Sequence, residues 1–197
     1  MAKINMDITN ITNITSIVTG SLGTLLSTYS IFKKSKVEAF FAEFEKNQDV
    51  MQKIEENDLL KSYFYKIIEI VASEANAKKL IYWKKVILIL PHSTNNLDYT
   101  EDFIKILDSL SVTDLTVLHY IYANNFKNLE FKKDVINYFN NIGISQNYIE
   151  KNLKSIASHN LISEVQEVSA RLGLSYLPIE YHKNDFGIEF IKFCSDI

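Results

Sequence analysis

Apolar residues recur at three- and four-residue spacing along most of this chain, the pattern of helices that bury one face. One such helix is predicted to carry an aromatic face of Phe40, Phe41 and Phe44. Asn57 stands where a further helix is expected to begin, because an Asn side chain accepts hydrogen bonds from the free N–H groups of a first turn. Pro91 is expected to end a later helix, since proline cannot continue the helical hydrogen bonds.

A loop is predicted for residues 92–99, and Thr100 then opens another helix. Ser111 and Asp114 have the spacing of a capping box, in which each side chain bonds the backbone of the other residue. The helix that follows is apolar on most sides, which predicts a central position. The chain has only five Gly and two Pro among 197 residues. Sandwiches and barrels need more turn residues, so the composition also favours a mainly α fold.

Two further helices are predicted, about residues 130–140 and 146–158. Between them, Gly143 suits the left-handed conformation that ends a helix, and Ser145 suits the cap of the next one. This arrangement predicts a short, tight turn between two helices.

Two short strands, within residues 161–165 and 176–181, and a closing helix that starts at residues 184–187 complete the predicted elements. Three helices, a two-stranded wing and a closing helix resemble the winged-helix family over about residues 109–195. The resemblance rests on the turn around Gly143, the helix after it, and the step from that helix into the first strand. It implies a DNA-binding or a protein-docking use, because both occur on this fold.

The resemblance divides the chain into a helical N-terminal region, residues 1–108, and a winged-helix-like domain, residues 109–197 with a small β wing. As a whole the chain looks like uncharacterised proteins of low-GC bacteria and their phages. That looser resemblance implies no activity.

If residues 146–158 take the place of a recognition helix, their polar side chains can reach bases or phosphates. The candidate nucleic-acid-binding residues are Gln146, Asn147, Lys151, Asn152 and Lys154, with Glu150 opposing them. Residues 101–197 hold nine basic and 13 acidic side chains, a net charge of −4. Phosphate contacts supply much of the affinity of DNA-binding proteins, so this charge disfavours nucleic acid and favours a protein partner or a second copy of the chain.

Residues 8–32 carry no charge and comprise 11 large apolar residues, two Gly and 12 Ser, Thr or Asn. Their apolar residues form one helical stripe, which predicts an amphipathic helix packed against protein. A row of small residues at four-residue spacing suits a close helix contact: Ser16, Gly20, Thr24 and Thr28. The segment is also long enough to lie on or in a membrane, which stays open as an alternative.

No pattern of catalytic or cofactor chemistry occurs in the sequence. The four histidines lack the spacing of a metal site, and no phosphate-binding glycine loop or nucleophile motif is present. The single cysteine, Cys194, excludes a disulfide within the chain and is expected to be a small buried apolar residue. We therefore predict a protein without enzymatic activity, cofactor or metal, in a reducing compartment such as the cytoplasm.

These observations favour a protein-interaction module, such as a bacterial or phage regulator or inhibitor. A winged-helix transcriptional regulator that binds DNA is the first alternative. A membrane-associated effector that uses residues 8–32 is the second.

Overall fold

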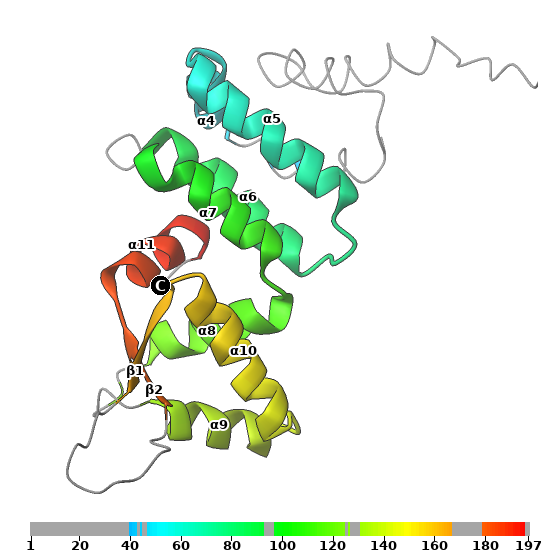
Figure 1. Ribbon diagram of the computed structural model, residues 1–197. Helices are drawn as coiled ribbons and strands as arrows, with labels where there is room; N and C mark the ends of the chain where they lie inside the picture. Colours follow the sequence, from blue (N-terminus) through cyan, green and yellow to red (C-terminus); the bar gives the residue numbers. More distant parts are fainter. Residues whose placement is uncertain are drawn as a thin grey trace, which may run out of the picture. The chain divides into compact units, whose positions relative to one another are not determined.

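The computed structural model describes residues 40–42, 44, 47–92, 97–124, 126, 131–166 and 179–195. Over this part of the chain the fold is mainly helical with one small two-stranded antiparallel sheet near the C-terminus, which confirms the predicted fold class (Figure 1). Residues 8–32 lie outside the described residues, so the helix contact predicted for Ser16, Gly20, Thr24 and Thr28 stays a prediction.

The chain divides into two compact units, Met1–Asp98 and Tyr99–Ile197. The elements of the first unit are α4 (Gln48–Glu55), α5 (Asp58–Ser73), α6 (Lys79–Ile89) and the short helix η1 (Leu90–His92). Those of the second are α7 (Leu97–Ser109), α8 (Val112–Ala123), α9 (Lys132–Asn141), α10 (Gln146–Ser158), β1 (Ile162–Gln166), β2 (Ile179–Lys183) and α11 (Asp185–Cys194). Helix α7 thus begins at Leu97 and not at Thr100, and the second unit starts before the expected boundary at residue 109.

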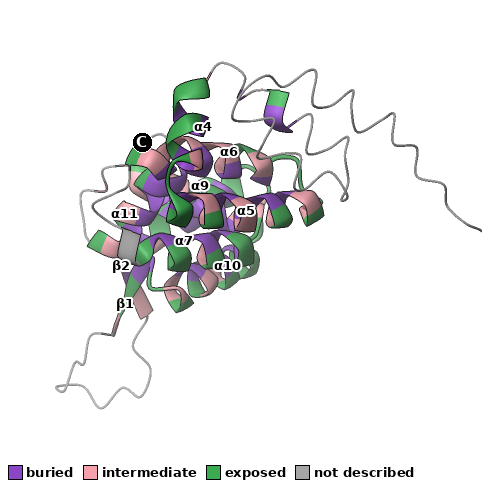
Figure 2. Cartoon of the chain, turned by 90° about the horizontal axis from the view of Figure 1, so that it is seen from above, coloured by how far each residue is buried: buried purple, intermediate pink, exposed green. Residues whose placement is uncertain are grey.

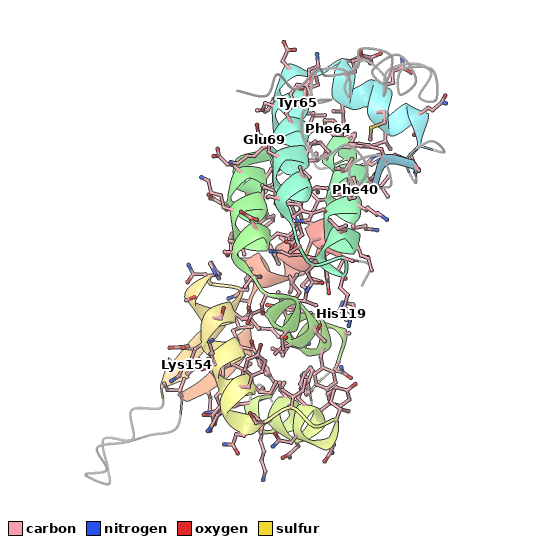
Figure 3. All side chains as sticks on the ribbon, turned by 90° about the vertical axis from the view of Figure 1, so that its right-hand side faces the viewer. Phe40, Phe64, Tyr65, Glu69, His119 and Lys154 are labelled. Carbon is pink, nitrogen blue, oxygen red and sulfur yellow. The ribbon has the colours of Figure 1, made fainter. Side chains whose placement is uncertain are left out.

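Aromatic packing forms part of the core of the first unit. The rings of Phe40, Phe41 and Phe44 are buried, with centroids 5.4–5.9 Å apart, as the sequence pattern predicts. Phe41 also meets Phe64 of α5 at 5.6 Å, and Phe40 and Phe64 are labelled in Figure 3. Asn57 caps α5 as expected, because its Oδ1 accepts hydrogen bonds from the N–H groups of the two residues after Asp58.

In the second unit α8 is the central helix, as its apolar composition predicts, and it contacts α9, α10 and α11. Its N-terminus carries the predicted capping box. The N–H of Asp114 donates to Ser111 Oγ at 3.1 Å, and the N–H of Ser111 donates to Asp114 Oδ2 at 2.9 Å. Helix α7 belongs to this unit through its rings, since Phe103 lies 5.4 Å from Phe190 of α11.

Helices α9 and α10 both end in a Schellman motif, with the residue after the cap in the left-handed conformation. Gly143 takes this position after α9, with φ +89°, as predicted. Asn160 takes it after α10, with φ +58°, and Asn tolerates this region better than most residues. Ser145 precedes α10 at the cap position, but its side chain makes no cap hydrogen bond, so that part of the expectation is wrong.

The sheet pairs β1 with β2 in antiparallel register, with Ile162 opposite Lys183 and Glu164 opposite Tyr181. The second strand is Ile179–Lys183, and residues 176–178 of the predicted strand 176–181 lie outside the described residues. Side chains of Ile162 and Tyr181 are buried, whereas Glu164 is exposed. The two buried side chains thus come from both strands, and by the alternation of the pleat they lie on the same face of the sheet.

Tyr122 joins three elements where α11 begins. Its hydroxyl donates to the carbonyl oxygen of Leu161 at 2.6 Å and accepts from the N–H of Asn184 at 3.2 Å. The Asn184 side chain caps α11 by accepting from the N–H of Gly187 at 2.8 Å, and it donates to the carbonyl oxygen of Asn160 at 2.9 Å. These bonds fix the end of α10, the start of β1 and the start of α11 to one point on α8.

We predict that Gly187→Ala destabilises the second unit by about 3 kcal/mol, because a Cβ at this position overlaps the carbonyl oxygen of Leu161 and the hydroxyl of Tyr122. The control is Gly143→Ala, whose Cβ meets no atom but whose positive φ costs about 1 kcal/mol. Hydrogen exchange at the amides of α8 and α10 measures both effects. Equal protection in the two variants would contradict the close approach at Gly187.

The buried hydroxyl of Tyr122 should make the stability of the second unit depend on pH in the alkaline range. Burial raises the pKa of Tyr122 to about 12. The hydrogen bond from the Asn184 backbone opposes this rise, and the nearby Asp185 carboxylate adds to it. At neutral pH, Tyr122→Phe leaves the Leu161 carbonyl without its donor and costs about 1–3 kcal/mol. Between pH ~10 and ~12 the unfolded phenol ionises while the folded one keeps its proton, so the wild type loses stability that the variant does not lose. The stability difference measured by urea unfolding should narrow over this range.

Candidate interaction surfaces of the second unit

The outer face of α10 holds the residues that the sequence assigns to nucleic acid. Gln146, Asn147, Lys151 and Lys154 are all exposed. Figure 2 shows exposed residues along this helix, and Figure 3 labels Lys154 on it. Asn152, the fifth candidate, is buried and donates its side-chain N–H to the carbonyl oxygen of Tyr148 at 2.9 Å, so that assignment is wrong.

Glu150 reduces what this face offers to a phosphate. The Gln146 side-chain amide donates to Glu150 Oε1 at 3.1 Å, and the Lys132 ammonium of α9 lies 3.9 Å from the same oxygen. Both are partly exposed, so the ion pair adds little stability. It does occupy one amide and one lysine that would otherwise be available to a ligand.

Carboxylates also gather where α10 meets the sheet. Burial raises the pKa of Tyr181 to about 12, and three carboxylates add to the shift: Glu164, Glu150 and Glu180. They come from both strands and from α10. A winged helix on DNA would place phosphates near both elements, and this charge opposes such a contact.

A different surface lies along α9. Tyr138 stacks on Tyr120 of α8, with ring centroids 4.1 Å apart and an interplanar angle of 17°. Phe139 meets both rings edge-on, and Phe126 meets Tyr120 in the same way at 5.9 Å. Tyr138 is nevertheless 44% exposed, so part of the residue is open to a ligand although Tyr120 stacks on its ring.

Ile142 extends this surface by one helical turn. It follows Tyr138 by four residues, so the two side chains share a face, and it is 59% exposed. Tyr148, just past the turn, is 44% exposed. Asp134 stands one turn before Tyr138 on the same stripe and is also exposed. We call Asp134, Tyr138 and Ile142 the α9 stripe. The sequence analysis did not predict this surface, although the four-residue spacing of these residues indicates that they share one face of a helix.

Two histidines pair with serine hydroxyls. His159 Nε2 lies 3.1 Å from Ser109 Oγ, and His119 Nδ1 lies 3.0 Å from Ser195 Oγ. The Ser109 hydroxyl also donates its single proton to the carbonyl oxygen of Ile106 at 2.8 Å. With its proton on the Ile106 carbonyl, the hydroxyl can only accept from His159, and in that arrangement the histidine does not act as a base toward it.

Among the described residues, no group of three or more His, Cys, Asp or Glu side chains is placed to hold a metal ion. Within the same part of the chain, every helix is too short or too polar to cross a bilayer. Comparison with known proteins adds no relative: no family model matches the chain, and no curated protein or solved structure is significantly similar to it.

Cys194 lies in the core, 1% exposed, as expected for a small apolar residue, and burial raises the pKa of its thiol. We predict that Ellman's reagent does not label the native protein and labels one thiol per chain after unfolding in guanidinium, because the thiolate is the reactive form. Since the chain has one cysteine, the absorbance reports this site alone. Rapid stoichiometric labelling in native buffer would contradict the buried position.

Proposed function

We propose that residues 99–197 form a winged-helix-like unit that docks onto a protein partner through the α9 stripe and acts as a regulator or inhibitor without catalysing a reaction. The observation that carries this proposal is the position of exposed apolar side chains. Of five large hydrophobic residues that are exposed in the described part of this unit, three lie on α9, α10 or the turn between them: Tyr138, Ile142 and Tyr148. Aromatic anchors held by neighbouring rings are typical of protein interfaces.

DNA binding by α10 is the second candidate. It is supported by Asn147, Lys151 and Lys154, which lie at four- and three-residue spacing and share the outer face of the helix. It is opposed by the carboxylates of Glu150, Glu164 and Glu180 around the same face. We therefore rank it below protein docking. A membrane role for residues 8–32 and a cytoplasmic location stay predictions.

A pull-down with matched variants tests the docking surface. We predict that Tyr138→Ser with Ile142→Ser loses a partner that the wild type retains from a lysate of the source cells. Lys151→Ala with Lys154→Ala, on α10, should retain it. Quantitative mass spectrometry measures both, and hydrogen exchange at α8 confirms that each variant is folded. Loss of the partner in the α10 variant alone would contradict docking through α9.

Fluorescence anisotropy with duplex DNA tests the alternative. We predict only weak binding that disappears with rising salt, because the two α10 lysines release few counterions. Binding that survives moderate salt, discriminates between sequences and is lost in the Lys151→Ala, Lys154→Ala variant would place DNA binding first.

A further inference from the structure

The α9 stripe combines a carboxylate, an aromatic face and an aliphatic side chain at four-residue intervals. Asp134, Tyr138 and Ile142 follow one another at this spacing, so their side chains lie along one side of the helix. The stripe is thus acidic at one end and apolar at the other. A ligand that covers it must carry positive charge next to an apolar group.

The Asp134 carboxylate is available to such a ligand. No described residue forms an ion pair with it, and no lysine stands three or four residues away on α9. Lys133, its neighbour in sequence, projects about 100° away around the helix, as consecutive helical residues do. The Lys132 ammonium lies 3.9 Å from Glu150. The positive charges of α9 therefore do not neutralise Asp134.

The Tyr138 ring beside Asp134 is held in place before any ligand arrives. Tyr120 stacks on it at 4.1 Å, and Phe139 meets its edge at 5.1 Å. Burial raises the pKa of Tyr120, and the neighbouring Tyr138 and Asp134 add to this shift, so the carboxylate lies within electrostatic reach of the tyrosine pair. A rigid ring costs little side-chain entropy on binding, which favours stacking of a planar group on it.

We propose that the α9 stripe recognises an arginine side chain of the protein partner, whose guanidinium stacks on Tyr138 and pairs with the Asp134 carboxylate while a neighbouring apolar residue contacts Ile142. This inference rests on the proposed docking function and names the partner's chemistry. Arginine fits better than lysine because its planar guanidinium stacks on aromatic rings and bonds a carboxylate through two N–H groups.

The test uses the full chain labelled with ¹⁵N and three synthetic helical peptides that differ at one position, which is arginine, lysine or citrulline, next to a leucine. Citrulline keeps the shape of arginine without its charge. We expect the arginine peptide to shift the amide resonances of residues 134–142 and to bind about fivefold more tightly than the citrulline peptide, with the lysine peptide between them. Equal binding of the arginine and citrulline peptides would overturn the proposal, as would shifts confined to other elements.

Matched variants locate the interaction. Asp134→Asn keeps the side-chain shape and should reduce arginine binding to about the citrulline level. Tyr138→Leu keeps an apolar residue and should weaken the arginine peptide more than the citrulline peptide. Lys151→Ala with Lys154→Ala is the control on α10 and should change neither. An unchanged affinity in Asp134→Asn would overturn the proposal.

A single-stranded oligonucleotide tests whether the α9 stripe instead binds nucleic-acid bases. If it shifts the same resonances and Asp134→Asn strengthens its binding, the stripe is a base-stacking surface and the arginine proposal is wrong. Failure of this inference is distinguishable from failure of the docking function. If Tyr138→Ser with Ile142→Ser loses the cellular partner but Asp134→Asn keeps it, docking stands and arginine recognition falls.

Discussion

The close approach of α11 to α8 is the constraint on which the second unit depends. The first turn of α11 passes so near to Tyr122 and Leu161 that only glycine fits at position 187. At this point Tyr122 and Asn184 supply the hydrogen bonds that the buried backbone groups need. Because the end of α10, both strands and α11 meet here, one tyrosine sets where the sheet lies relative to the helices. Because α8 occupies the centre, α9 and α10 each turn one face toward it and the opposite face toward solvent.

Much of this fold was predictable because its signals are local. Asn57, the pair Ser111 and Asp114, and Gly143 all act within one helical turn, so the residue type is enough to predict the conformation. Asn184 is similar, since it caps α11 from three residues away. The helix ends predicted from these residues therefore lie close to the observed ones.

The remaining features depend on residues that are distant in sequence. Tyr120 and Tyr138 stack from separate helices, and nothing in either helix alone predicts that they meet. Asn152 has the polarity of a surface residue, but it lies on the face of α10 that packs against the rest of the unit, and its side-chain amide is satisfied by the carbonyl oxygen of Tyr148.

The net charge of the second unit also does not predict which ligand each surface favours, because it averages over surfaces of opposite sign. Helices α9 and α10 hold four lysines and two carboxylates, whereas the other described residues of the unit hold three lysines and eight carboxylates. The helices are thus more basic than the unit's net charge suggests. Even so, Lys132 lies close to Glu150, and Asp134 of the α9 stripe forms no ion pair with any residue that the structure describes. Since exposed charges are screened beyond about 10 Å at ordinary salt, a ligand responds to the few side chains that it touches. The charge that a ligand meets on this unit is therefore set by the spacing of residues within each helix and not by the net charge of the unit.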